Sequence, residues 1–269
     1  MQHVPNKRPA ALTFNGSLYH AVRLAYVAAA MLCSAAESSH AQALNVPAAE
    51  TCLTANQDLS LRAGLPHTAA RLKTKELLKI VAIGSSSTVG LWTLRSADTY
   101  PEVMRRELSR LTSNAKILVI NSGRVGDTIP GNVARFERDV LSYKPDLVVW
   151  QLGTNDVAWG GHPDDQLKST VVQGVRVLKA SGTDVILMDL QYAPMVLRSA
   201  YHSKMESIIS EVAQQERIGL FSRFTLMRKA IDAGVTPSML VSWDGLHNTV
   251  EGYDCIGRAL ARTISSNTH

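Results

Sequence analysis

The sequence has few of the residues that metal centres require and little of the charge pattern that nucleic-acid binding requires. It contains three cysteines among 269 residues, and no Cys/His cluster has the spacing of zinc ligands, so we expect no metal site. The net charge is only +5, and no run of lysine and arginine is interleaved with aromatic residues. We therefore expect no nucleic-acid partner. Internal repeats and low-complexity tracts are also absent, and the composition is that of an ordinary globular protein.

Long apolar runs are lacking as well, and the one near the N-terminus belongs to a targeting pattern. Basic residues up to Arg23 precede the apolar run 24–36, which is too short to span a bilayer comfortably. The triplet 41–43 (AQA) then supplies a small-x-small cleavage pattern. We predict that residues 1–43 are a signal peptide and that the protein is exported, periplasmic or secreted, with no stable membrane insertion after cleavage. An uncleaved N-terminal anchor is the alternative.

Beyond this segment the sequence predicts an extension followed by one domain. Residues 44–75 are mixed and non-periodic, which is typical of an extension wrapped on the surface of the domain at 76–269. Within that domain, apolar runs alternate with helical patterns. The runs predict strands at 77–83, 117–120, 147–152, 185–190 and 218–221, and the helical patterns lie at 100–111, 129–141, 164–180, 199–216, 224–233 and 249–265.

This alternation is typical of the α/β class. It predicts a three-layer α/β/α sandwich with a central parallel five-stranded sheet, as in flavodoxin-like folds. In such sheets ligands bind beyond the carboxyl ends of the strands. Functional residues are therefore expected in the loops that follow the strands and near the C-terminus.

Four polar segments lie at those places. They are 84–90 (GSSSTVG), 121–128 (NSGRVGDT), 153–156 (GTND) and 244–247 (DGLH). The first matches neither the G-x-S-x-G elbow nor the P-loop. Each segment alone is an ordinary turn, cap or polar loop. Together they supply the nucleophile, base, orienting acid and oxyanion donors that acyl transfer requires.

In this order the four segments resemble the sequence blocks of the SGNH hydrolases, also called the GDSL esterase/lipase family. The resemblance extends over about residues 77–265, and the form of the first block is similar to that of exported bacterial members. It implies a serine nucleophile, a histidine base oriented by an aspartate, and an oxyanion hole that also uses the nucleophile's own N–H. The residues are Ser86, His247 and Asp244 for the triad, with Ser86, Gly126 and Asn155 for the oxyanion hole.

The first block departs from the family pattern at one position. The aspartate of the family's Gly-Asp-Ser sequence is Ser85 here, which removes a negative charge beside the site and leaves the nucleophile position intact. Ser85 and Ser87 are expected to point into the backbone of the turn. Four aromatic residues either line a substrate pocket or serve packing: Trp92, Trp159, Tyr192 and Trp243.

The resemblance implies a serine esterase that hydrolyses carboxylic (acyl or acetyl) esters without a cofactor. Its partner would be a small-molecule or glycan ester, since the family does not specify one ester. Two alternatives stay open. One is an acetyl transferase acting on an envelope polysaccharide, and the other is a non-catalytic module that binds an anion at the glycine-rich turn.

The cysteines predict one covalent link. Cys33 lies in the signal segment, so Cys52 and Cys255 remain in the mature chain. In an oxidising compartment we expect them to form a disulfide that attaches the extension to the last helix. Two buried free thiols are the alternative.

Overall fold

A five-stranded, all-parallel sheet forms the centre of the protein. The computed structural model describes residues 48–55, 60–159 and 161–268, so the predicted signal segment lies outside the described residues. The strand order is β2-β1-β3-β4-β5, which confirms the predicted α/β class. The strands are β1 Leu78–Gly84, β2 Ile117–Gly123, β3 Leu147–Gln151, β4 Asp184–Met188 and β5 Gly219–Phe221.

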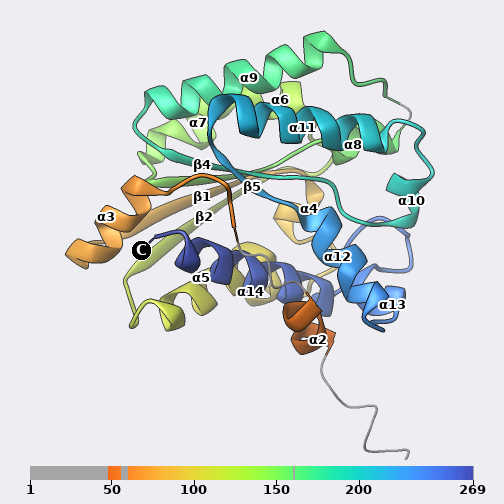
Figure 1. The fold of residues 1–269 in the computed structure, drawn as a ribbon, viewed down its shortest axis with the longest axis horizontal. Coiled ribbons are helices and arrows are strands. Elements are labelled where there is room, and N and C mark those ends of the chain that lie inside the picture. Colours follow the sequence, from red (N-terminus) through yellow and green to blue (C-terminus); the bar gives the residue numbers. More distant parts are fainter. Residues whose placement is uncertain (1–47, 56–59, 160, 269) are drawn as a thin grey trace, which may run out of the picture. The chain divides into compact units, whose positions relative to one another are not determined.

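Helices cover both faces of this sheet, as Figure 1 shows. The helices α6, α7, α8, α9 and α11 lie on one side, and α2, α5, α12 and α14 lie on the other, which gives the predicted three layers. The helical elements are α2 Ala48–Ala55, α3 Pro66–Thr74, α4 Ser86–Val89, η2 Ser96–Asp98, α5 Tyr100–Leu111, α6 Ile129–Ala134, α7 Phe136–Asp139, η3 Leu141–Tyr143, α8 Thr154–Ala158, α9 Asp165–Ala180, α10 Pro194–Leu197, α11 His202–Glu216, α12 Arg223–Asp232, α13 Pro237–Leu240 and α14 Val250–Ser266.

The strand register brings the functional loops to one edge. Gly84 at the end of β1 pairs with Gly123 at the end of β2, and Ile83 pairs with Trp150 in β3. The chain leaves β1 toward β2 and then crosses to β3 on the other side of β1. Because connections diverge there, a crevice opens at the carboxyl ends of these strands, and this is where parallel sheets bind ligands.

Local signals explain the long helices. The side chain of Asp164 caps α9 by accepting the N–H of Leu167, and Thr249 caps α14 by accepting the N–H of Gly252. Gly257 allows α14 to approach α5, since a Cβ there would lie 2.6 Å from a carbon of Val103. The two helices that carry the chain to and from the sheet edge are therefore closely packed.

One predicted helix is wrong in extent. The pattern at 129–141 predicted a single helix, but the structure breaks it into α6, α7 and η3. The break falls at Arg135, whose side chain is only 6% exposed and turns inward. Its guanidinium donates to the carboxylate of Asp127 and to the carbonyl of Gly84. These contacts with the sheet edge take precedence over continuation of the helix.

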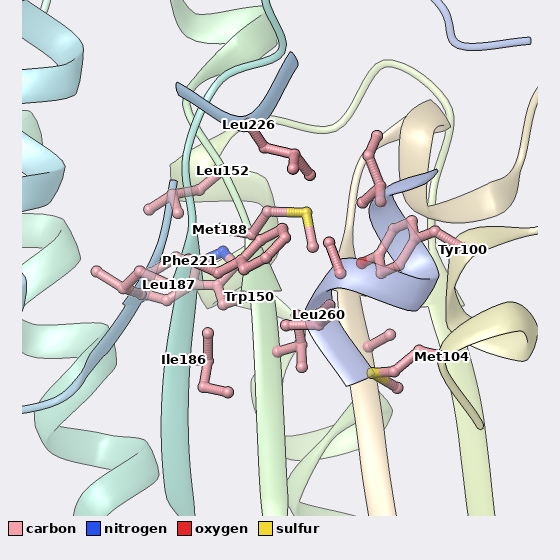
Figure 2. Packing of buried hydrophobic residues seen from close by; sticks show 14 of the residues in the cluster. Tyr100, Met104, Trp150, Leu152, Ile186, Leu187, Met188, Phe221, Leu226 and Leu260 are labelled. Carbon is pink, nitrogen blue, oxygen red and sulfur yellow. The ribbon is translucent and has the colours of Figure 1, made fainter. Parts of the chain in front are cut away.

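The described part of the extension contributes to the core rather than lying only on the surface. Leu61 and Leu65 are buried within the main apolar cluster. Thr68 donates both its backbone N–H and its hydroxyl to Asp184, at the amino end of β4. Figure 2 shows another part of the same cluster, where Met188 and Phe221 of the neighbouring strands β4 and β5 lie side by side.

A disulfide joins the extension to the last helix in the structure. Cys52 of α2 and Cys255 of α14 are both fully buried, and their Cα atoms are 6.0 Å apart. An ion pair between Glu50 and Arg258 lies on the same pair of helices, with an N–O distance of 2.6 Å. Within the described residues, the helices are all too short or too polar to cross a bilayer.

We predict that this disulfide stabilises the oxidised protein. It closes a loop with a sequence separation of 203 residues, so Cys255→Ala should lower the free energy of unfolding by about 2–4 kcal/mol. Denaturant titration of the oxidised protein measures the change, with Cys33→Ala as the control. Mass spectrometry of a non-reduced digest should find the 52 and 255 peptides cross-linked. Free thiols at both positions in unreduced protein would contradict the pairing.

Candidate active site

The nucleophile candidate lies on a tight strand–turn–helix segment. Ser86 is the first residue of α4 and is 4% exposed, two residues after β1 ends at Gly84. A Cβ at Gly84 would lie 2.7 Å from Oε1 of Gln151, so a glycine is required where the turn passes β3. Gly90 ends the short helix in the left-handed region, with φ at 86°. The turn therefore presents Ser86 at the carboxyl edge of the sheet.

Gln151, at the end of β3, holds this turn in place. Its Oε1 accepts the backbone N–H of Ser85 at 2.9 Å, the hydroxyl of Ser85 at 2.9 Å and the hydroxyl of Thr88 at 3.1 Å. The expectation that Ser85 and Ser87 point into the turn backbone is thus wrong. Ser85 binds a side chain, and the buried hydroxyl of Ser87 has no partner among the described residues. The position of the family aspartate is occupied by a neutral anchor.

Ser86, His247 and Asp244 form a hydrogen-bonded chain. Ser86 Oγ lies 2.8 Å from Nε2 of His247, and Nδ1 of His247 lies 2.5 Å from Oδ2 of Asp244. The other carboxylate oxygen, Oδ1, accepts the backbone N–H groups of Leu246 and His247 at 3.0 Å each. The turn is closed by the N–H of Ser242, which donates to the carbonyl of His247 at 2.7 Å. The structure therefore brings all three predicted residues together.

The Asp244 carboxylate is kept ionised by its donors. Partial burial by itself raises the pKa of Asp244, but the hydrogen bonds from the His247 ring, the Leu246 N–H, the Trp92 indole and the His247 N–H outweigh burial and lower the pKa to about 2. An ionised carboxylate bound to Nδ1–H leaves Nε2 as a proton acceptor that faces Ser86. This is the arrangement that a general base requires.

The predicted oxyanion donors lie on two neighbouring loops. Gly126 is exposed and has a φ of 76°, and Asn155 lies in α8 directly after β3. The side-chain amide of Asn155 donates one hydrogen to the carbonyl of Asp127, next to Gly126, at 2.8 Å. An amide has two such hydrogens, so the second stays available for a ligand. The β2 loop is also joined to the nucleophile turn, because the Asn121 amide donates to the carbonyl of Thr88 at 2.7 Å.

Three supporting residues around the β2 loop were missed from the sequence. Asp127 accepts from Arg135 and from Asn132, both at 2.6 Å, and the Asp127–Arg135 ion pair is almost fully buried. The indole of Trp150 in turn donates to Asn132 at 2.9 Å. Burial of an ion pair is tolerated where further hydrogen bonds satisfy both partners. No periodicity marks these residues, and only the position of Asp127 inside the second polar segment was a signal.

The four aromatic candidates have different positions. Trp92 donates its indole N–H to Oδ2 of Asp244 at 2.8 Å, and Trp159 donates to Oδ1 of Asn155 at 3.4 Å. Trp243 is 84% exposed, and its ring lies 5.4 Å from that of Trp92. Tyr192 instead packs edge-on against Phe224. Three tryptophans therefore lie beside the candidate site, while Tyr192 serves packing.

Other candidate ligand sites in the described ranges lack these residues. A cavity of about 890 Å³ lies at the amino ends of β1 and β2, lined by Lys73, Lys75 and Lys116, among others. None of the predicted site residues lines it. No group of three or more His, Cys, Asp or Glu side chains in the described part of the chain is arranged to hold a metal ion.

Comparisons with known proteins agree with this site. Residues 51–269 match the model of the Non-GDSL lipase-like family. The chain is 24% identical to an arylesterase of Vibrio mimicus over 186 residues, covering 69% of this chain and 88% of that protein. It is 27% identical to an acetylxylan esterase of Geobacillus stearothermophilus over 161 residues, covering 55% and 72%.

The fold is also that of solved esterases. The structure of a two-domain esterase active on acetylated mannans is similar, with a TM-score of 0.65, 20% identity and 78% of this chain covered. The present chain spans 56% of that protein, a little over half of its length. Taken with the family match over most of the sequence, these similarities identify the chain as a carboxylic ester hydrolase that belongs to the Non-GDSL lipase-like family, within the SGNH hydrolases.

Proposed function

We propose that this protein hydrolyses acyl esters, including acetyl esters, with Ser86 as nucleophile, His247 as general base and Asp244 as the acid that orients the base. The observation that carries the proposal is the continuous hydrogen-bonded chain from Ser86 Oγ through both nitrogens of His247 to Asp244. A serine hydroxyl is a weak nucleophile until an adjacent base takes its proton. These contacts supply that base in the required tautomer.

The reaction proceeds in two halves. As Ser86 Oγ bonds to the ester carbonyl carbon, its proton passes to Nε2 of His247, and Asp244 stabilises the imidazolium. The proton then passes to the leaving alcohol as the ester C–O bond breaks, which leaves an acyl-serine. Water attacks this acyl group, again with His247 taking a proton, and the carboxylic acid and free Ser86 are released.

The oxyanion of each tetrahedral intermediate would be held by three N–H donors. The N–H of Ser86 lies at the first turn of α4, where backbone donors have no partner within the helix. The N–H of Gly126 and the second amide hydrogen of Asn155 complete the set. The hydrogen bond from Asn155 to the Asp127 carbonyl supports this role, because it holds the amide beside Gly126 before substrate binds.

We further propose that the acyl group is small. The relatives include an arylesterase and an acetylxylan esterase, and a structural neighbour is active on acetylated mannans. These similarities support acetyl esters of aryl or sugar alcohols as substrates. Export of the protein, predicted from residues 1–43, is part of the same proposal. The Cys52–Cys255 disulfide supports it, since disulfides persist in oxidising compartments.

The first prediction concerns the nucleophile. Ser86→Ala should abolish hydrolysis of a chromogenic acetate ester and of acetylated xylan, because no other hydroxyl is bonded to Nε2 of His247 in the described residues. Ser87→Ala is the matched control and should keep its activity, since that hydroxyl has no hydrogen-bond partner in the described structure. A fluorophosphonate probe should label Ser86. Labelling of a different serine, or an active Ser86→Ala protein, would overturn the assignment.

A second prediction concerns the oxyanion hole. Asn155→Ala should lower kcat by about 10²–10³ with little change in KM, because the amide would act on charge that develops only in the transition state. Steady-state kinetics measure both constants, and thermal unfolding checks that α8 is intact. A rise in KM with unchanged kcat would instead assign Asn155 to ground-state binding.

A third prediction separates the acid from the base. His247→Ala should lose more activity than Asp244→Ala, because the Ser242–His247 backbone hydrogen bond still helps to place the imidazole when the carboxylate is removed. The pKa of Asp244 is about 2, so this group stays ionised as the pH falls to that range. The acid limb of the kcat/KM profile therefore reports protonation of His247 and should persist in Asp244→Ala. Equal losses of kcat in the two variants would contradict the prediction.

A further inference from the structure

Trp92 joins the nucleophile turn to the Asp244–His247 turn. Its indole N–H donates to Oδ2 of Asp244 at 2.8 Å, the same oxygen that binds Nδ1 of His247. The remaining donors to Asp244, the N–H groups of Leu246 and His247, come from its own turn. In the described structure Trp92 is thus the one hydrogen-bond donor that reaches this carboxylate from another part of the fold.

The backbone that carries Trp92 is continuous with the nucleophile. Gly90 and Leu91 both donate their N–H groups to the carbonyl of Ser86, at 3.1 Å each. The hydroxyl of Tyr253, from α14, donates to the carbonyl of Leu91 at 3.1 Å. The contacts therefore close a ring that runs from Ser86 through the turn to Trp92, on to Asp244 and His247, and back to Ser86. A ring of this kind sets the distance between the nucleophile and the base.

The conformation of Trp92 is costly and is maintained by these contacts. Its φ is +73°, in the left-handed region that bulky side chains rarely adopt. Such a conformation persists only where the surroundings determine it, and it is found most often at functional sites. The indole also lies edge-on to the His247 ring, with centroids 6.5 Å apart, while Trp243 covers its other surroundings at 5.4 Å.

We propose that Trp92 is a positioning residue that fixes the Asp244–His247 pair relative to Ser86 through its hydrogen bond to Oδ2 of Asp244. The inference rests on the proposed triad. It assigns a role in orientation and charge balance to a side chain outside the four sequence segments. The indole shares the charge of Oδ2 between two donors, which limits how strongly the carboxylate stabilises protonated His247. Tyr253 is the other titratable side chain whose charge acts on Asp244.

The test is a double-mutant cycle on the full chain with a chromogenic acetate ester. Trp92→Phe keeps a ring and removes the N–H, and it should lower kcat about tenfold with KM unchanged. In the Asp244→Ala background the same change should have no further effect. The acid limb of the kcat/KM profile should move to higher pH in Trp92→Phe. Trp243→Phe is the matched control and should keep both constants, because that indole donates no hydrogen bond to a described residue.

Trp92→Gly keeps the inference testable if the phenylalanine variant folds poorly. Glycine adopts a φ of +73° without strain, so this variant should be as thermally stable as the parent and still lose kcat. An equal loss of kcat in the presence and absence of Asp244 would overturn the inference, as would a change in KM alone or an unmoved acid limb. Full activity in Asp244→Ala or Ser86→Ala would instead show that the proposed triad itself is wrong.

Discussion

The hydrogen bond between Ser86 and His247 spans 161 positions of the chain, and the rest of the structure serves to hold its two ends at 2.8 Å. Ser86 is placed by the end of β1, and His247 by a turn that leads into α14. A shift of about 1 Å between them would break the contact and cost a large part of the rate. The sheet register and the packing of α14 on α5 are thus conditions for chemistry as well as for stability.

The carboxyl edge of the sheet is unusually polar below the site, and its groups are satisfied by one another. Gln151 accepts three hydrogen bonds from the nucleophile turn, and Arg135 crosses under the β2 loop to reach Gly84. Further along the edge, burial lowers the pKa of Arg223 to about 10 and raises that of Asp189 to about 6. Buried polar networks of this kind are high in cost unless satisfied, and they fix one arrangement of the loops when they are.

The N-terminal extension acts on the same site from a distance. Its helix α2 lies on α14 and carries both Cys52 and the ion pair from Glu50 to Arg258. α14 begins at Val250, three residues after His247. Constraint of this helix therefore limits motion of the catalytic turn as well as unfolding of the extension. The tether and the turn are parts of one unit at the C-terminal end of the chain.

Much of this protein follows from local sequence patterns. Apolar runs and helical periodicity predicted all five strands and the helix at 100–111, since these signals depend on neighbouring residues and on burial alone. The four polar segments predicted the residues that the structure joins into one hydrogen-bonded chain. The break at Arg135, the anchoring of the turn by Gln151 and the core role of Leu61 had no such signal.

Trp92 is the sharpest example of that difference. Its indole reaches Asp244 across 152 positions, and nothing in the residues around either one indicates the contact. The sequence by itself determined the strands, their order along the chain and the chemistry of the loops, because those properties are local. Only the tertiary structure decided which distant side chains satisfy the buried turns and the Asp244 carboxylate, because those partners are selected by sheet order and helix packing.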